Sequence, residues 1–147
     1  MAGSGASSYS GDGGQAILAT LKNASVVCLD TSGNVFIADR DNCRIRKVRV
    51  TTGIITTVAG NGHKGSTKSS VAATSTSLEG PQDVVVDSSG NIFISDRDNR
   101  QVHKVIASTG IIMTIAGSGY KDSHSPRTSD VATEFKFGDP VGIALDS

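Results

Sequence analysis

The chain has 147 residues, a length that fits one domain, and its 14 basic and 14 acidic side chains leave a formal net charge of zero. This balance provides neither an overall basic field for nucleic acid nor an acidic field for a cationic partner. Glycine is frequent, with 17 residues, whereas Phe, Tyr and Trp number four, two and none, which favours short strands joined by tight turns. No apolar run approaches the ~20 residues that span a bilayer, and no signal peptide is visible, so the localisation stays unknown.

The first predicted element is a partial loop between repeated units, residues 1–23, and the first predicted unit of four strands follows over 24–60. Most of this unit occurs twice. Residues 30–60 recur as residues 87–117 at a constant offset, and 19 of the 31 aligned positions are identical. A fixed period of this size indicates a repeat architecture.

The second unit, residues 81–117, shows four strand signals in chain order. The first is a continuous β-branched run, which suits an inner strand covered on both faces, and the third carries more polar residues, as an outer strand does. The four signals lie at 84–86, 91–95, 101–107 and 111–116. We therefore predict that each unit is an antiparallel four-stranded meander, the blade of an all-β propeller.

Aspartate, asparagine and glycine residues mark the turns of both units, and we expect them to be structural. An aspartate side chain can accept hydrogen bonds from nearby backbone N–H groups, and glycine adopts a positive φ without strain. The predicted turn residues are Asp30, Gly33, Asp39, Asn42, Asp87, Gly90, Asp96 and Asn99.

Longer loops at 61–80 and 118–139 separate the units, and each is expected to contain a helical turn or two near its end. Residues 140–147 repeat the opening strand of a unit. Two complete units do not close a ring, because propellers typically have about 4–8 blades. Residues 1–147 are therefore interpreted either as one segment of a longer propeller or as a chain that closes a ring with copies of itself, for example as a trimer.

The repeated residues resemble the NHL repeat. The shared pattern is an Asp-x-Ser-Gly-Asn turn, then Phe-Ile-x-Asp, Lys-Val and Thr-Gly, and finally Ala-Gly, in units of extended length. The first unit departs from the pattern at Ala24, where the second has Pro81, and the second unit departs at Arg100 and Gln101. The resemblance implies a propeller of about six blades that acts as a non-catalytic scaffold for a protein or other ligand.

Strand direction predicts where such a ligand binds. Strands alternate in direction, so the turn between the second and third strands lies at the same end of the sheet as the long loop that leaves the fourth. Loops on a rigid scaffold concentrate binding residues. The candidates on this face are Arg40, His63, Lys64, Arg97, Tyr120, Lys121 and Asp122. For Arg40 and Arg97, an ion pair with an aspartate of an adjacent blade is the structural alternative.

Two other functions stay open. Some propellers that resemble this family are metal-dependent lyases or hydrolases, although the apolar inner strands of this chain supply no metal ligands. Other propellers of this kind bind RNA. A basic cluster on the third strand of the first unit could contact phosphate, but we interpret it as an outward-facing charged stripe, with His103 also facing solvent. The cluster comprises Arg44, Arg46, Lys47 and Arg49.

No cofactor, metal or membrane partner is expected. Residues 60–65 match the GxGxxG pattern, but no apolar-faced helix follows, as a dinucleotide site would need. Cys28 and Cys43 are placed on two strands separated by a third, which holds their backbones about 10 Å apart. A disulfide needs a Cα separation of roughly 4.4–6.8 Å, so we expect two unpaired thiols.

Overall fold

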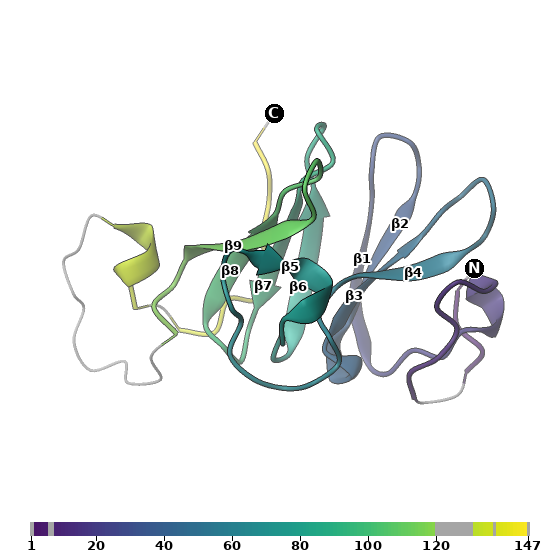
Figure 1. The fold of residues 1–147 in the computed structure, drawn as a ribbon, viewed down its shortest axis with the longest axis horizontal. Coiled ribbons are helices and arrows are strands. Elements are labelled where there is room, and N and C mark those ends of the chain that lie inside the picture. The colour runs from purple at the N-terminus through teal and green to yellow at the C-terminus, as the bar shows by residue number, and fades with distance from the viewer. Residues whose placement is uncertain (1, 6–7, 120–130, 137, 147) are drawn as a thin grey trace.

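Two antiparallel sheets stand side by side in the computed structural model, which describes residues 2–5, 8–119, 131–136 and 138–146 (Figure 1). The first sheet consists of β1 (Ala24–Leu29), β2 (Val35–Asp39), β3 (Arg44–Val48) and β4 (Ile55–Ala59). The second consists of β6 (Pro81–Val86), β7 (Ile92–Asp96), β8 (Gln101–Val105) and β9 (Ile111–Ala116), with the two-residue β5 (Val71–Ala72) beside β9. The prediction of all-β propeller blades is confirmed, and β5 is an addition to it.

The outer strand of each sheet is covered by the segment that precedes that sheet in the chain. Ala72 of β5 pairs with Ile111 of β9, and at the corresponding place in the first blade Gln15 forms an isolated bridge with Ile54 beside β4. An uncovered edge strand presents free N–H and C=O groups to other strands. The loops between blades therefore also protect the sheet edges.

Single 3-10 turns occur in the two longer loops, as the sequence predicts, and a third lies in the partial loop before the first blade. They are η1 (Ala16–Leu18), η3 (Ala73–Ser75) and η4 (Ala132–Glu134). The first residue of each turn accepts a hydrogen bond from a glycine that begins the same loop. These bonds are Gly3 N to Ala16 O (2.9 Å), Gly60 N to Ala73 O (2.8 Å) and Gly117 N to Ala132 O (2.9 Å). The loops thus share one geometry although their sequences differ.

The main hydrophobic core lies between the two sheets. Because side chains alternate along a strand, Phe36 and Ala38 of β2 face the second sheet, while Ile92 and Ile94 of β7 face the first. All four side chains are buried, as is Leu78, which ends the loop before β6. The two blades are held together by this apolar contact.

The opposite face of the first blade is partly uncovered. Val27 and Leu29 of β1 are each 63% exposed, whereas Val84, which holds the place of Val27 in the second blade, is 0% exposed. The difference arises because the first blade covers Val84, and no described residue covers Val27 in the same way. An apolar face of this kind favours association with another sheet.

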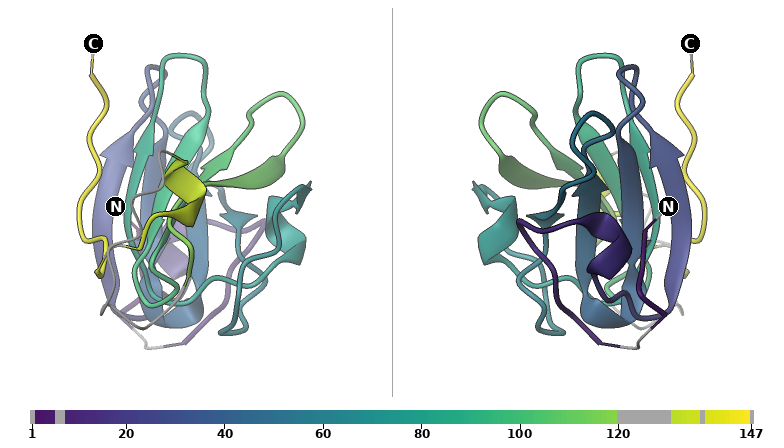
Figure 2. Two further views of the ribbon diagram at one scale, coloured as in Figure 1. Left: turned by 90° about the vertical axis from the view of Figure 1, so that its left-hand side faces the viewer. Right: turned by 90° about the vertical axis from the view of Figure 1, so that its right-hand side faces the viewer.

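Residues 138–146 have no regular secondary structure, although the sequence predicts the first strand of a third blade over 140–147. The segment lies on the same side of the molecule as β1, opposite η3 (Figure 2). Its Ile143 N donates a hydrogen bond to Asp83 Oδ2 at 2.9 Å. A strand needs a hydrogen-bonded ladder, and no strand among the described residues provides a partner here.

Candidate functional site

The long loops and the tight hairpin turns lie at opposite ends of the blades. In Figure 1 the hairpin turns of both sheets are at the top, whereas the turn η2 (Arg40–Asn42) and the loop that follows β4 are at the bottom. The side chain of Arg44 joins these two lower segments, because its Nη1 donates to Asn42 O at 3.0 Å and its Nη2 to Asn61 O at 2.8 Å. We call the end formed by residues 39–43, 61–80 and 96–100 the loop face.

In the first blade, the turn residues of the loop face bind the preceding loop. Asp39 is fully buried, and its Oδ1 accepts hydrogen bonds from Lys22 N at 2.8 Å and from Asn42 Nδ2 at 3.0 Å. Asn42 Nδ2 also donates to Ser8 O at 2.8 Å. These side chains therefore fix the backbone of a neighbouring segment in addition to their own turn.

The second blade repeats this arrangement. Asp96 is fully buried, and its Oδ1 accepts a hydrogen bond from Glu79 N at 2.8 Å. Its Oδ2 accepts from Asn99 Nδ2 at 2.7 Å and from Thr67 Oγ1 at 3.1 Å. Asn99 Nδ2 also donates to Gly65 O at 2.9 Å. The loop before the second blade is thus attached to one buried carboxylate at two places, Thr67 and Glu79.

The expectation that the basic cluster on β3 faces outward is wrong for Arg46. Its side chain is 0% exposed, with Nη2 2.7 Å from Asp12 Oδ1 and Nη1 3.3 Å from Asp39 Oδ2. Arg46 Nη2 also donates to Ser10 O at 3.1 Å. The segment that contains Ser10 and Asp12 covers this face of β3, so the guanidinium is buried and acts as part of the loop attachment.

The expectation that His103 faces solvent is also wrong. His103 holds the place of Arg46 in the second blade and is fully buried, with Nε2 3.4 Å from Asp96 Oδ2 and Nδ1 3.1 Å from Thr114 Oγ1. Ser69 takes the place of Asp12, and its Oγ accepts a hydrogen bond from Thr114 N at 3.1 Å. The equivalent positions 46 and 103 therefore both lie beneath a loop, but the first carries a guanidinium and the second an imidazole.

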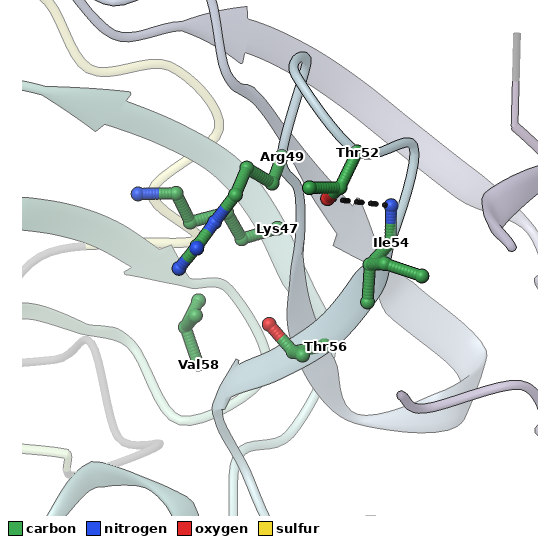
Figure 3. Close-up of a pocket in the computed structure, with 6 residues that line it drawn as sticks. All are labelled: Lys47, Arg49, Thr52, Ile54, Thr56 and Val58. Atoms are coloured by element: carbon green, nitrogen blue, oxygen red, sulfur yellow. Dashed lines mark hydrogen bonds between the residues drawn. The ribbon is translucent and has the colours of Figure 1, made fainter. Parts of the chain in front are cut away.

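The two remaining cations of the cluster, Lys47 and Arg49, line a groove between the blades (Figure 3). One part of the groove has a volume of 480 Å³, and an adjoining part of 340 Å³ shares Lys47 and Val58 with it. Gly90 and Gly110 line the second part, so the groove opens toward the hairpin end. The larger part is lined by residues of the first blade alone, whereas residues of both blades line the smaller part, so the sequence of a single unit does not reveal the whole groove.

The described candidates on the loop face are only partly accessible. His63 and Lys64 are exposed, whereas Arg40 and Arg97 are half-buried. Arg97 Nη2 lies 3.1 Å from Asp139 Oδ2, so this arginine pairs with an aspartate of the loop after the second blade. In the described part of the chain, no hydrogen bond or ion pair joins these four side chains to one another. The remaining candidates, Tyr120, Lys121 and Asp122, lie outside the described residues.

At the hairpin end, aspartate side chains close the first turn of each blade. Asp30 Oδ1 accepts hydrogen bonds from Ser32 N and Asn34 N, both at 2.9 Å, and Asp87 makes the equivalent bonds. Burial would raise the pKa of Asp30, but the hydrogen bonds from Asn34 and Ser32 outweigh it and lower the pKa. The Asn91 side chain is the main cause of the lowered pKa of Asp87.

Gly33 and Gly90 occupy equivalent positions in these turns. They adopt φ values of 80° and 81°, a left-handed conformation that side-chain-bearing residues rarely take. A glycine at this position therefore lets the chain reverse within the few residues that the aspartate closes.

Matches to family models appear along most of this scaffold. The model of the Teneurin NHL domain matches residues 4–76, and the model of the NHL repeat matches residues 78–105. The chain belongs to the NHL-repeat family. Its NHL repeats correspond to the two sheets described above, and the loop face and the groove are features of these NHL blades.

Solved structures similar to the NHL chain include two proteins from Bacteroides thetaiotaomicron VPI-5482. One is a structural genomics protein of unknown function, with a TM-score of 0.59 and 18% identity, covering 74% of this chain and 26% of that one. The other is an auxiliary nutrient binding protein, with a TM-score of 0.63 and 19% identity, covering 82% of this chain and 32% of that one. At these identities the likeness shows the fold alone. The NHL chain spans about a quarter to a third of the length of these structures.

No curated protein matches the sequence. In the residues that the structure describes, no group of three or more His, Cys, Asp or Glu side chains is arranged to hold a metal ion. The described residues also contain no helix that is long and apolar enough to cross a membrane.

The two thiols of the NHL chain are unpaired, as predicted. Burial raises the pKa of Cys28 to about 11, with smaller contributions from the negative charges of Asp83 and Asp30. Cys43 was expected on a strand, but it ends η2 in the left-handed conformation, with φ of 52°. Burial is also the main cause of its raised pKa.

Proposed function

We propose that this NHL-repeat chain is a non-catalytic binding scaffold that engages a protein ligand through its loop face. The observation that supports the proposal is the pair of buried polar networks centred on Asp39 and Asp96. Each network attaches an irregular loop to a rigid blade by hydrogen bonds of 2.7–3.1 Å. Binding residues are concentrated on loops that a rigid scaffold positions.

Fixed loops favour binding because little conformational freedom is lost when the partner arrives. The loop before the second blade carries His63 and Lys64 as exposed side chains on a backbone that is held at Gly65 and Glu79. A structurally similar protein is described as nutrient binding, which supports a binding role in the same broad sense. The RNA-binding alternative is weakened, because Arg46 is buried and ion-paired and therefore contributes no surface charge.

Selection of ligands from a peptide display library tests the proposal. Peptides that bind the wild-type chain are expected to lose most of their affinity for a triple variant of the loop face, Arg40→Ala/His63→Ala/Lys64→Ala. A matched variant of three exposed residues at the hairpin end, Thr51→Ala/Ser88→Ala/Ser108→Ala, should retain binding. Peptides that depend only on the hairpin end, or that bind both variants unchanged, would contradict the proposal.

A further inference from the structure

The groove between the two blades is large enough for a small ligand. Its adjoining parts measure 480 Å³ and 340 Å³, within the range of roughly 300–1,000 Å³ typical of ligand pockets. Lys47 and Val58 line both parts, so the two form one continuous groove. It opens at the hairpin end and is therefore separate from the loop face.

The two parts of the groove differ in polarity. The larger part presents two cations, Lys47 and Arg49, together with threonine side chains, and none of the residues that line it is acidic. The smaller part is mainly apolar, and the residues that line it include Phe36, Ile92 and Val105. A ligand that fits both parts needs an anionic group at one end and an apolar chain at the other.

The two cations of the groove differ in the contacts that they already make with the protein. Lys47 Nζ lies 3.5 Å from Asp30 Oδ2 and 4.8 Å from the centre of the Phe36 ring, so it already has protein partners. Arg49 is exposed, and in the described part of the chain no carboxylate lies within ion-pair distance of its guanidinium. A guanidinium can donate two parallel hydrogen bonds to a carboxylate, which makes Arg49 the stronger anchor for an anion.

The second blade shows that the fold does not require these polar side chains. At the positions of the second blade that correspond to Arg49 and Thr56, the chain has Ile106 and Met113. Lys47 corresponds to Lys104, which lies over Phe93 at 5.2 Å just as Lys47 lies over Phe36. The lysine over an aromatic ring is thus shared by both blades, whereas Arg49 and Thr56 are specific to this groove.

We propose that the groove binds an amphipathic carboxylate. Arg49 and Lys47 hold the carboxylate group by charge-assisted hydrogen bonds, and the apolar chain lies along Val58 toward Phe36 and Val105. Because each methylene group removed from water favours binding, affinity rises roughly fourfold per methylene until the groove is filled. The site lies at the end opposite the loop face, so its failure would leave the proposed function untouched.

Isothermal titration calorimetry with saturated carboxylates tests the proposal, using octanoate, decanoate and dodecanoate below their micelle concentrations. We expect one ligand per chain, affinity that increases along the series, and binding of dodecanol at least about tenfold weaker than that of dodecanoate. The variant Arg49→Ile, which introduces the side chain that the second blade carries, should weaken dodecanoate binding by about tenfold or more. The variant Lys104→Gln removes one cation from the equivalent place on the second blade and should change the affinity by less than about twofold.

Three results of the titrations would overturn the proposal: no measurable binding of dodecanoate, several equivalent ligands per chain, or equal losses of affinity in the two variants. Urea unfolding of both variants verifies that they are folded. Chemical-shift changes in NMR spectra of the wild-type chain locate the bound ligand independently of any substitution. These changes should be confined to the residues that line the groove, at 36, 47–58, 90–92 and 105–110. Changes centred on the loop face would contradict the proposal as well.

Discussion

Replacing Arg46 by methionine removes the cation that two carboxylates share in the first blade. The Arg46 and Asp39 side chains are both 0% exposed, whereas Asp12 is 34% exposed. Methionine is unbranched and replaces the apolar stem of arginine but lacks the guanidinium, so the substitution leaves the buried Asp39 carboxylate without its cation. We expect this uncompensated charge to dominate the loss of stability.

The expected loss in the free energy of unfolding follows from the burial of the Arg46–Asp39 ion pair. Breaking a buried ion pair by removing one partner destabilises a protein by about 3–5 kcal/mol. Asp39 keeps the hydrogen bonds from Lys22 N and Asn42 Nδ2, which places the expected loss at the lower end, about 3 kcal/mol. With a urea m-value of about 1.5 kcal/mol per molar, the unfolding midpoint should fall by roughly 2 M.

Equilibrium urea unfolding followed by far-ultraviolet circular dichroism measures this change. The variant Asp12→Asn is the control, because Asp12 is partly exposed and its pair with Arg46 should contribute no more than about 1 kcal/mol. If the midpoint of Arg46→Met fell by less than about 0.5 M with an unchanged m-value, the guanidinium would contribute no more than a surface ion pair. The assignment of Arg46 to a buried loop attachment would then be wrong.

Three further predictions concern other parts of the chain. At pH 8 the native Cys28 thiol should react with a disulfide reagent far more slowly than in urea, because its pKa is raised to about 11, and equal rates would contradict this. The pKa values of Asp30 and Asp87 are lowered by folding, so the stability they contribute is present above about pH 4 and is lost as the pH falls through their folded values. Urea unfolding should show that the stability declines as the pH falls, and the variant Asp87→Asn should show a smaller decline. An equal decline in this variant would argue that the Asp87 turn does not contribute to the pH dependence. The exposed face formed by Val27 and Leu29 predicts concentration-dependent association, which Val27→Thr/Leu29→Lys should abolish. Light scattering that gives 15.1 kDa for the wild-type chain at every concentration would refute the association.

The repeat and its turn residues were sufficient to predict the blades. Residues 30–60 and 87–117 supply the strand alternation and the aspartate and glycine turns, and these features are local in the sequence. The burial of Arg46 and His103 was not predicted, because the segments that cover them belong to the preceding loops, far away in the sequence, and carry no strand signal. One signal was available: Val48 is two residues after Arg46 and therefore on the same face, which argued against a solvated stripe.

The candidate binding surfaces were predicted only in part. Strand direction predicted which segments make up the loop face, but it did not show that Arg97 is held by Asp139. The groove could not be predicted from one unit, because its smaller part combines Lys47 and Val58 of the first blade with Val105 of the second. Its shape depends on how far the two blades diverge, and the sequence of neither blade determines that.

The two faces of the third strand in each blade vary in different ways. Beneath the loops, Arg46 and His103 differ in charge but both lie against the buried aspartate that attaches the loop. In the groove, Arg49 directly follows the third strand, and Ile106 replaces it at the corresponding position of the second blade. A position that only maintains the fold should keep its contacts when its residue changes, whereas a position that contacts a ligand need not. The contrast therefore separates scaffold positions from binding positions within one repeat, and it identifies Arg49 as the residue whose substitution should alter binding without altering stability.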